Sequence, residues 1–534
     1  MSKIEIRKTC IIIHNYEPGD CEFIEHKFSI YDKLYHKYFM KGMYWDPNTK
    51  DLYLPAGIDF YYITRNFGDD IWNKVKADEF MELNQSVKLK YAPRDEVQKK
   101  AIKFCLGIDE YMNNRNSSQI SVNLNTGKGK TYVAIAVMAY YNIRTIMITS
   151  SIDWIDQWRE KIKEYTNIKD DEIYTIAGSS SIAKLVNGMK NLSTIKFFLC
   201  SHDTIRSFAT KYGWENVHKL FRGLKIGIKI YDEAHLYFDN ICMIDFYTDV
   251  WKTYYLTASP MRSDRFEDYI YQEAFRTVPK IDLYDEQNDP HTEYIAIKFN
   301  SHPTPKDISR CQNPYGFDRI RYTDYLITRP NYYRILQIIM NIILSTTSYE
   351  GKSLIYIGTN KAILVTYNWL KYYYPGISIG LFSSLVPKSD KRNQLNNKII
   401  LTTTKSAGAA LDIPGLEITV ILNEPFKSKV LAQQTLGRTR DRNTRYIDVV
   451  DIGFRTLNYY YNQKKPVFKK YATSCKEMSF SDYTLDYQIQ ELEAQQQEQK
   501  DPNRELKEVV VIVPKEKREE YAKKQQFTSQ YREV

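Results

Sequence analysis

Apolar positions along this chain fall into short runs separated by polar turns, and the spacing of the runs changes along its length. Up to about residue 85 the runs are short and of β type, with turn signals such as Glu17-Pro18-Gly19-Asp20 between them. The strands predicted in this stretch are residues 10–13, 28–31, 51–55 and 60–64. We therefore predict a small β-rich N-terminal domain over residues 1–85.

From about residue 86 the pattern changes to apolar runs that alternate with helical stretches. Over residues 86–285 the predicted strands are 122–124, 145–148, 195–199, 226–231 and 254–256. Over residues 326–465 they are 353–357, 377–382, 398–402, 419–422 and 446–452. Buried strands alternating with helices are typical of a parallel sheet covered on both faces. The predicted fold class is therefore α/β, with two tandem parallel-sheet lobes.

Two further stretches lack this alternation. Residues 286–325 show no clear periodicity and contain Asn, Asp, Pro and His, so we interpret them as a connector. Residues 466–534 become polar, with a Gln- and Glu-rich run at 488–500. That composition predicts a C-terminal tail that is helical or disordered.

Composition narrows the class of protein. The chain has 534 residues, of which 43% are hydrophobic and 26% charged, as in soluble globular proteins. Seven cysteines without CxxC pairs disfavour a zinc site or a disulfide framework and favour a reducing compartment. No apolar run reaches about 18 residues and the first residues are charged, so we expect neither a membrane span nor a signal peptide. We expect a cytoplasmic protein and favour a monomer. The net charge of +10 is compatible with a nucleic-acid partner but weak evidence for one.

The sharpest local motif is the segment 125–131, with sequence NTGKGKT, between an apolar run and a helical pattern. A glycine-rich turn there lets backbone N–H groups surround phosphate oxygens at a helix N-terminus. Lys130 is expected to reach the β- and γ-phosphates of ATP and Thr131 to hold Mg²⁺. The alternative is a surface turn rich in Lys and Gly, and Leu124 stands where the general motif has its first glycine. The predicted phosphate-binding residues are Thr126, Gly127, Lys128, Gly129, Lys130 and Thr131.

A second motif, Asp232-Glu233-Ala234-His235, follows a buried strand about 100 residues later. A carboxylate at the end of a strand beside the phosphate loop can hold the metal, and the next one can deprotonate the attacking water. Asp232 is therefore the predicted Mg²⁺ ligand and Glu233 the predicted base. Taken alone, two acids after an apolar run usually mark only the end of a strand.

In this order and spacing, the motifs resemble those of superfamily 2 helicases over residues 90–455, which have two RecA-like lobes. The resemblance implies that Gln98 contacts the adenine base. It also implies that the segments around Ser150, Gln157 and Thr204 contact a nucleic-acid strand. Residues 256–262, LTASPMR, resemble the segment that couples the two sites, with hydroxyls that can bond to the acidic pair.

The resemblance continues in the second lobe. Residues 403–408 with 411–414 are similar to the family's motif V, in which Thr404 and Gly408 would meet the strand backbone and Asp412 the nucleotide. Residues 434–438, QTLGR, are similar to motif VI, which makes Arg438 the arginine finger. The family's second arginine falls on Asp441 here, so Arg440 or Arg442 is expected to replace it.

The resemblance implies an ATP- and Mg²⁺-dependent motor with ATP held between the lobes. It is nearest to the UvsW-type helicases of phages and large DNA viruses, which would place the protein in the host cytoplasm. Those proteins act on branched DNA and R-loops in replication, recombination and repair. DNA is thus the favoured partner, with duplex DNA held by the N-terminal domain. Two alternatives share every ATP-site residue: an RNA helicase or transcript-release factor, and a duplex DNA translocase subunit of a larger complex.

Overall fold

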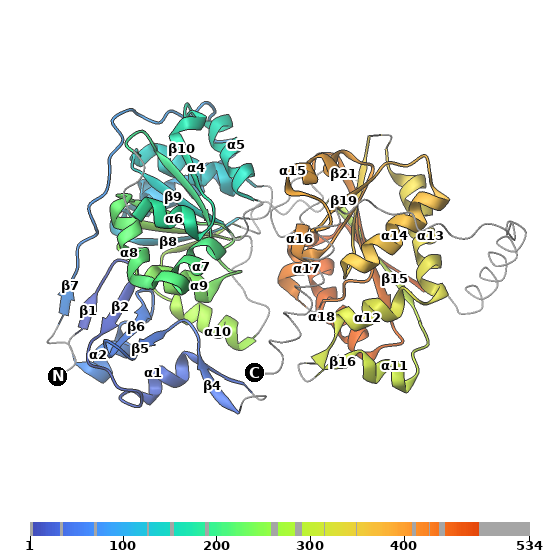
Figure 1. The fold of residues 1–534 in the computed structure, drawn as a ribbon, viewed down its shortest axis with the longest axis horizontal. Helices are drawn as coiled ribbons and strands as arrows, with labels where there is room; N and C mark the ends of the chain where they lie inside the picture. The colour runs from blue at the N-terminus through green and yellow to red at the C-terminus, as the bar shows by residue number, and fades with distance from the viewer. Residues whose placement is uncertain are drawn as a thin grey trace, which may run out of the picture. The chain divides into compact units, whose positions relative to one another are not determined.

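The chain folds into two compact units, residues 1–289 and 290–534 (Figure 1). The computed structural model describes residues 4–32, 36–68, 72–124, 128–149, 154–186, 192–257, 265–283, 291–313, 316–348, 350–407, 413–426, 428–436 and 444–479. Among the helices in these ranges, none combines the length and apolar character needed to cross a bilayer.

The first unit opens with a mostly antiparallel sheet in the order β5-β6-β2-β1-β7. Its strands are β1 (Ile4–Ile6), β2 (Cys10–Ile13), β5 (Tyr44–Asp46), β6 (Asp51–Pro55) and β7 (Trp72–Lys74). A separate antiparallel ribbon is formed by β3 (Ser29–Asp32) and β4 (Lys37–Met40). Two short helices, α1 (Glu22–Lys27) and α2 (Tyr61–Phe67), complete this β-rich part.

The rest of the first unit is a parallel sheet in the order β10-β11-β9-β12-β13-β8-β14. Its strands are β8 (Gln119–Asn123), β9 (Thr145–Thr149), β10 (Ile173–Ile176), β11 (Phe197–Ser201), β12 (Ile228–Tyr231), β13 (Lys252–Thr257) and β14 (Lys280–Asp282). The helices are α3 (Glu96–Leu106), α4 (Lys130–Tyr141), α5 (Ile155–Tyr165), α6 (Ser179–Val186), α7 (His202–Tyr212), α8 (Trp214–Gly223), α9 (Phe238–Phe246) and α10 (Arg265–Ala274). Strands β9, β11, β12 and β13 are buried along their whole length, because helices shield both faces of the sheet.

The second unit is built on another parallel sheet, in the order β19-β20-β18-β21-β22-β15-β23. Its strands are β15 (Thr292–Phe299), β18 (Lys352–Tyr356), β19 (Ile379–Phe382), β20 (Ile399–Thr402), β21 (Leu416–Ile421), β22 (Thr444–Asp451) and β23 (Ser474–Ser479). The helices are α11 (Pro305–Arg310), α12 (Arg319–Leu326), α13 (Pro330–Thr346), α14 (Asn360–Tyr373), α15 (Lys388–Lys391), α16 (Thr404–Ala407), α17 (Lys429–Leu436) and α18 (Arg455–Tyr471), with a small ribbon of β16 (Gln312–Asn313) and β17 (Gly316–Phe317).

The two parallel sheets share one strand order. Numbered along the chain within each lobe, the strands of both sheets in the described residues run 3-4-2-5-6-1-7. The predicted fold class, two tandem RecA-like parallel-sheet lobes behind a β-rich N-terminal part, is therefore confirmed. The predicted polar tail from residue 480 onward lies outside the described residues.

Two segments differ from the sequence interpretation of the second lobe. Residues 286–325, interpreted as a connector, contain β15, which lies between β22 and β23 in the sheet. Residues 466–534, interpreted as a tail, contain the end of α18 and the edge strand β23. Charged positions concealed both strands, and the structure pairs those charges with each other: Lys298 of β15 bonds to Glu477 of β23.

A third segment, residues 60–64, was predicted as a strand because it is rich in aromatic residues, and this prediction was wrong. The segment starts α2, where the Asp59 carboxylate accepts the N–H of Tyr61 at 3.1 Å. Only Ile63 of this helix is buried, as expected for one turn of an amphipathic helix and not for a core strand.

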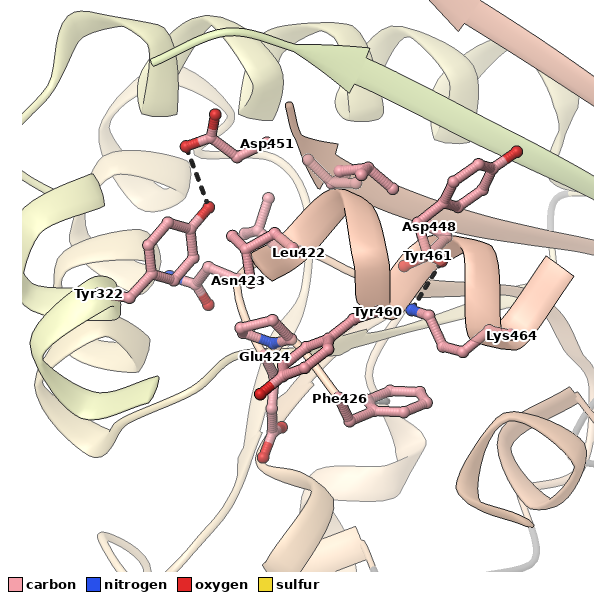
Figure 2. A pocket seen from close by; sticks show the side chains of 14 residues that line it. Tyr322, Leu422, Asn423, Glu424, Phe426, Asp448, Asp451, Tyr460, Tyr461 and Lys464 are labelled. Carbon is pink, nitrogen blue, oxygen red and sulfur yellow. Dashed lines mark hydrogen bonds and ion pairs between the residues drawn. The ribbon is translucent and has the colours of Figure 1, made fainter. Parts of the chain in front are cut away.

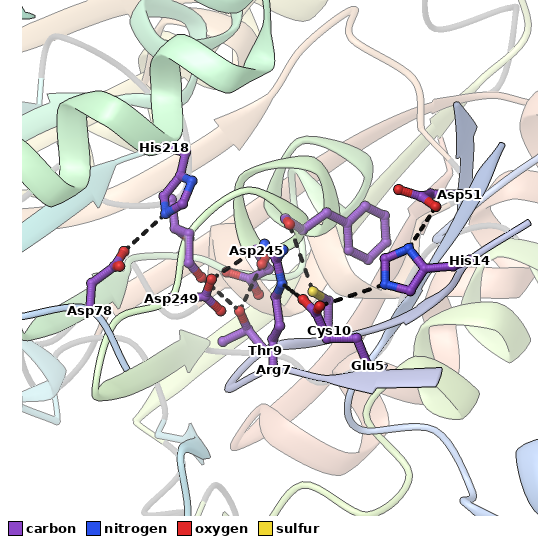
Figure 3. Close-up of polar contacts among 12 residues, drawn as sticks. Glu5, Arg7, Thr9, Cys10, His14, Asp51, Asp78, His218, Asp245 and Asp249 are labelled. Atoms are coloured by element: carbon purple, nitrogen blue, oxygen red, sulfur yellow. Dashed lines mark hydrogen bonds and ion pairs between the residues drawn. The ribbon is translucent and has the colours of Figure 1, made fainter. Parts of the chain in front are cut away.

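The N-terminal sheet packs against the first lobe through a shared core and a set of polar contacts (Figure 3). The hydroxyl of Thr9 donates to the carbonyl of Asp245 at 2.7 Å, and Arg7 pairs with Asp249 at 3.3 Å. Tyr53 of β6 stacks on Tyr247 just after α9, with ring centroids 5.3 Å apart. These contacts fix the N-terminal sheet to the segment that follows the Asp-Glu-Ala-His motif.

Candidate functional site

The carboxyl edge of the first parallel sheet brings the two sharpest motifs together. Lys130 begins α4 after β8, while Glu233 follows β12, and parallel strands direct both segments to the same edge of the sheet. Lys130 Nζ lies 2.7 Å from Glu233 Oε1, with side-chain exposures of 10% and 2%. A lysine and a carboxylate 103 positions apart in the sequence thus form one partly buried pair.

Gln98 belongs to the same site. Asp95 caps the N-terminus of α3 by accepting the N–H of Gln98 at 2.8 Å, which fixes the glutamine in the first turn. The buried Gln98 amide donates to the carbonyl of Lys128 at 3.4 Å. Gly129 has φ +93°, and a Cβ there would lie 2.0 Å from Gln98 Nε2. Glycine is therefore required at 129 both for its backbone conformation and for the space that Gln98 fills.

Asp232 is held by a residue whose role the sequence did not predict. Trp158 of α5 donates its indole N–H to Asp232 Oδ2 at 2.9 Å, and both side chains are buried. Burial raises the pKa of Asp232, and the neighbouring Glu233 carboxylate raises it further. The segment containing Trp158 was singled out in the sequence as a strand-binding element, but the contact to Asp232 depends on the packing of α5 against the sheet.

The backbone and the histidine of the acidic motif are also constrained. Glu233 has φ +52°, a left-handed conformation that is uncommon for residues other than glycine and concentrates at functional sites. His235 Nδ1 lies 2.8 Å from Thr257 Oγ1 and 3.5 Å from Glu233 Oε2. Thr257 is the second residue of the segment 256–262 predicted to couple the two sites, so the first hydroxyl of that segment reaches the acidic motif through His235. Residues 258–262 of the segment lie outside the described residues.

The donors at this edge fit a divalent cation. Asp232 and Glu233 are adjacent buried carboxylates, and Lys130 supplies one positive charge against their two negative charges. Burial is the main cause of the raised pKa of Asp232 and the adjacent Glu233 carboxylate adds to it, and a bound cation would offset both effects. Thr131, the second residue of α4, is half-buried beside Lys130. Carboxylate and hydroxyl oxygens are the ligands that Mg²⁺ prefers.

The predicted strand-contacting residues of the first lobe differ in their accessibility. Gln157 is half-buried in the first turn of α5. Thr204 is only 6% exposed, and its hydroxyl lies 2.9 Å from that of Ser201, the N-cap of α7. Thr204 therefore stabilises the start of a helix, and its contact with a strand stays a prediction.

In the second lobe, Thr404 is fixed by a buried carboxylate that the sequence did not single out, that of Glu424, which Figure 2 labels. Glu424 follows β21, is 1% exposed, and accepts the backbone N–H of Thr404 at 2.7 Å as well as its hydroxyl. Arg319 of α12 pairs with the same carboxylate at 3.0 Å. Glu424 lines a small cavity at the carboxyl ends of β21 and β22. Its carboxylate determines where the predicted motif V loop begins.

Several predicted site residues lie outside the described residues, and their roles remain predictions. They are Thr126, Gly127, Ser150, Gly408, Asp412, Arg438, Arg440 and Arg442.

One cluster away from this edge has the composition of a metal site. Ligand atoms of Asp78, His218 and Asp249 lie within 4.8 Å of one another. Arg7, however, already places a guanidinium nitrogen 3.3 Å from Asp249, and His218 Nε2 lies 3.1 Å from Asp78 (Figure 3). Since Arg7 and His218 already partner these carboxylates, we interpret the cluster as a polar contact between the end of β1, the segment before α3, and α8.

Comparison with known sequences places part of the chain in a helicase family. Residues 90–261 match the family described as "Type III restriction enzyme, res subunit". This segment, which contains Gln98, Lys130 and Glu233, is therefore a helicase-family domain.

Three relatives extend the comparison. The chain is 22% identical over 352 residues to "Transcript termination protein A18" of Yaba-like disease virus, covering 62% of this chain and 67% of that protein. It is 21% identical over 338 residues to the protein of the same name in Yaba monkey tumor virus, covering 60% and 64%. It is 28% identical over 109 residues to "Putative DNA 3'-5' helicase Rad25" of Haloarcula marismortui, covering 20% and 15%. The chain thus spans about two thirds of the length of the viral relatives.

Solved structures of two helicases align with both units at low identity. Dbp5 of S. cerevisiae bound to RNA and ADP BeF3 is 15% identical, with a TM-score of 0.49 over 75% of this chain and 93% of that chain. The Hef helicase domain of Pyrococcus furiosus is 14% identical, with a TM-score of 0.41 over 69% and 97%.

Proposed function

We propose that this protein is an ATP-driven nucleic-acid motor that uses ATP hydrolysis to move along or separate strands. The observation that carries the proposal is the 2.7 Å pair of Lys130 and Glu233 at the carboxyl edge of the first sheet. A structural ion pair alone would not require Gln98 against Gly129, nor an Asp232 carboxylate fixed by a tryptophan. Together these groups supply contacts for a base, a triphosphate and an attacking water.

In this proposal each group at the edge has one role. Gln98 binds the adenine edge, and Lys130 binds the β- and γ-phosphates. Thr131 and Asp232 would hold Mg²⁺, which screens the charge on the phosphates. Glu233 orients the attacking water and accepts its proton.

The second lobe completes the proposed site. Arg438 would meet the charge that develops on the γ-phosphate, with Asp412 and either Arg440 or Arg442 near the nucleotide. Ser150, Gln157 and Thr204 from the first lobe, and Thr404 and Gly408 from the second, would contact the strand backbone. Backbone contacts carry little sequence information, so the motor should act on many sequences.

For the substrate, we propose branched DNA or R-loops, as in UvsW-type helicases. A second candidate is a transcript-release factor, since two viral relatives named as transcript termination proteins align with 62% and 60% of this chain. The Rad25 relative, named as a DNA helicase, aligns with 20%. Both candidates require ATP hydrolysis coupled to a strand and differ in which strand stimulates it.

The test is an ATPase assay of the full chain with single-stranded DNA, duplex DNA, forked DNA, an R-loop and RNA. Lys130→Ala and Glu233→Gln should each lower strand-stimulated turnover by about 10²- to 10³-fold while the fold is kept. Lys99→Ala, at an exposed lysine of α3, is the matched control and should leave turnover unchanged.

Strong stimulation by forks or R-loops supports the first candidate, and stimulation by RNA supports the second. Stimulation by duplex without strand separation would indicate a translocase subunit. Unchanged turnover in Lys130→Ala would refute the site.

A further inference from the structure

The β3–β4 ribbon exposes aromatic side chains to solvent. It forms a two-stranded sheet of its own, and all four residues of β4 are exposed. Tyr31, Tyr38 and Phe39 are 45%, 57% and 36% exposed, and Met40 is 39% exposed. Apolar surface grouped in this way on an outer element is a common mark of an interaction site.

The rings lie on both faces of the ribbon. Tyr31 pairs directly with Tyr38 across the strands, and their ring centroids are 5.1 Å apart. Phe39 pairs with Ile30 and therefore lies on the opposite face, because successive side chains of a strand alternate. A flat binding platform would carry its rings on one face. Rings on both faces suit an element that stands between two partners.

Positive charge accompanies the rings. Residues 26–41 contain four lysines and two histidines against one acid, Asp32, and two of these lysines, Lys27 and Lys41, pair with acids of α10 and α9. Lys37 Nζ lies 4.8 Å from the centre of the Phe39 ring, on the same face of the ribbon. Aromatic rings beside lysines are how proteins bind unpaired nucleotides, because the rings stack on bases while the cations attract phosphates. This charge argues for nucleic acid over an apolar protein surface.

The base of the ribbon rests on helices that follow the nucleotide-site motifs. Lys41 pairs with Asp239 of α9 at 2.6 Å, and a Cβ on Gly42 would lie 2.7 Å from the Phe238 ring. Just before the other strand, Lys27 at the end of α1 pairs with Glu273 of α10 at 3.0 Å and donates to the Tyr269 hydroxyl at 2.8 Å. Helix α9 begins three residues after His235, and α10 begins at residue 265, soon after the coupling segment. The ribbon thus contacts α9 and α10, the helices that follow the Asp-Glu-Ala-His motif and the coupling segment. Under the proposed function, both of those segments would respond to ATP.

We propose that the β3–β4 ribbon is a wedge that stacks on unpaired bases where two strands separate, with Tyr38 on one side and Phe39 on the other. The inference rests on the proposed function for its substrate. It adds a strand-separating element in the N-terminal part of the chain to the ATP-dependent strand contacts of the two lobes.

The test uses the full chain and a fork with 2-aminopurine at the first unpaired position, prepared as DNA and as an RNA–DNA hybrid. The double variant Tyr38→Ala/Phe39→Ala should lose the stacking-dependent quenching of 2-aminopurine and separate strands at least about tenfold more slowly, because it removes two base stacks and the loss of one is already expected to cost about tenfold. Its ATPase rate with saturating single strand should stay within about twofold of the parent, because the ATP-site residues are untouched. The single variant Tyr38→Phe keeps the ring and should behave as the parent.

The matched control is Tyr372→Ala/Tyr373→Ala, which removes two adjacent exposed rings, 69% and 38% exposed, from α14 of the second unit. Quenching and strand separation should be unaffected in this control. Parental quenching and strand separation in Tyr38→Ala/Phe39→Ala would overturn the wedge, as would an equal loss of ATPase and strand separation. A parental ATPase that no strand stimulates would refute the proposed function instead, and quenching without nucleotide would still report on the ribbon.

Discussion

The two parallel sheets place a buried glutamate at the same topological position and give it different partners. In each sheet the fifth strand along the chain is followed within three residues by such a carboxylate: Glu233 after β12 and Glu424 after β21. Glu233 meets Lys130, which comes from the loop after the first strand of its sheet. Glu424 meets Arg319 and Thr404, the latter just after the fourth strand.

The loop after the first strand explains the difference. In the first sheet, β8 is followed by the glycine-rich segment that supplies Lys130. In the second, β15 is followed by Ser301, whose hydroxyl donates to Asp451 at 2.5 Å. Lys306 stands as far beyond β15 as Lys130 does beyond β8, but it is exposed on α11. The second carboxylate is instead bonded by Arg319 and by the hydroxyl and backbone N–H of Thr404. The carboxyl edge of such a sheet can therefore bind a nucleotide or position a strand-binding loop. The residues that face the buried glutamate decide which of the two it does.

The sheets also resemble each other in a buried lysine–aspartate pair. Lys229 lies 2.6 Å from Asp245 in the first unit, and Lys464 lies 2.8 Å from Asp448 in the second (Figure 2). All four side chains are at most 6% exposed. In low-dielectric surroundings, a charge left without its partner is strongly destabilising.

The largest effect on stability should come from breaking the second pair. Lys464→Met leaves the Asp448 carboxylate buried with the Tyr294 hydroxyl as a remaining donor, and should destabilise the second unit by about 3 kcal/mol. Denaturation followed by calorimetry should show one unit melting earlier while the other is unchanged. Lys476→Met, at a lysine that is 65% exposed and paired with Glu293, is the control and should cost less than about 0.5 kcal/mol. A parental melting curve for Lys464→Met would contradict the prediction.

A smaller effect, on strand-stimulated ATPase, should distinguish the role of Glu424 from that of Glu233. Glu424→Gln removes the charge that holds Arg319 and weakens the bond to the Thr404 N–H, so the concentration of strand for half-maximal ATPase should rise about tenfold. The maximal rate should change by less than about threefold. Glu233→Gln should show the reverse pattern: a large loss of the maximal ATPase rate and little change in the strand concentration for half-maximal ATPase. If both variants lost the maximal rate equally, the assignment of different roles would fail.

The smallest effect concerns the ionic contact that joins the N-terminal sheet to the first lobe. The hydrogen bond from His218 to the Asp78 carboxylate and the charge of that carboxylate raise the pKa of His218, while burial lowers it and Asp249 and Arg7 face it with opposite effects. Protonated His218 therefore stabilises the fold below its ordinary pKa of about 6.5, and this contribution is lost as pH rises through the raised value.

His218→Gln should accordingly lower the melting temperature more at pH 5.5 than at pH 8.5. The expected difference is roughly 1–2 °C, as for about 0.5 kcal/mol from a partly exposed pair. Melting curves of the parent and of His218→Gln, recorded at both pH values, measure this difference in the shift of the melting temperature. Equal shifts at both values would show that His218 acts through packing and not through its charge.

The sequence predicted the strands that are buried on both faces and missed those that depend on long-range partners. Continuous apolar runs such as residues 197–200 in β11 identify buried parallel strands directly. Strand β15 carries Glu293 and Lys298, and the edge strand β23 carries their partners Lys476 and Glu477. In β15 the short apolar run at residues 294–297 is flanked by Glu293 and Lys298, and β23 has no apolar run. These charges gain their partners only once the two strands are paired.

The same distinction applies to the candidate site. That Lys130 and Glu233 would meet followed from two motifs at the carboxyl ends of parallel strands. The roles of Trp158 and Glu424 could not be predicted, because each depends on how a neighbouring element packs against the sheet. Likewise, the sequence offered Thr204 as a strand contact, whereas its hydroxyl is engaged with the helix cap at Ser201.

The contact between Gln98 and Gly129 has a consequence for nucleotide choice. The glutamine amide lies where any side chain at position 129 would be, so a displacement of one is transmitted to the other at once. Under the proposed function, a purine with the wrong edge groups would push Gln98 and thereby disturb the phosphate loop itself. Discrimination among nucleoside triphosphates would then take place within the first lobe, before the second lobe takes part in the reaction.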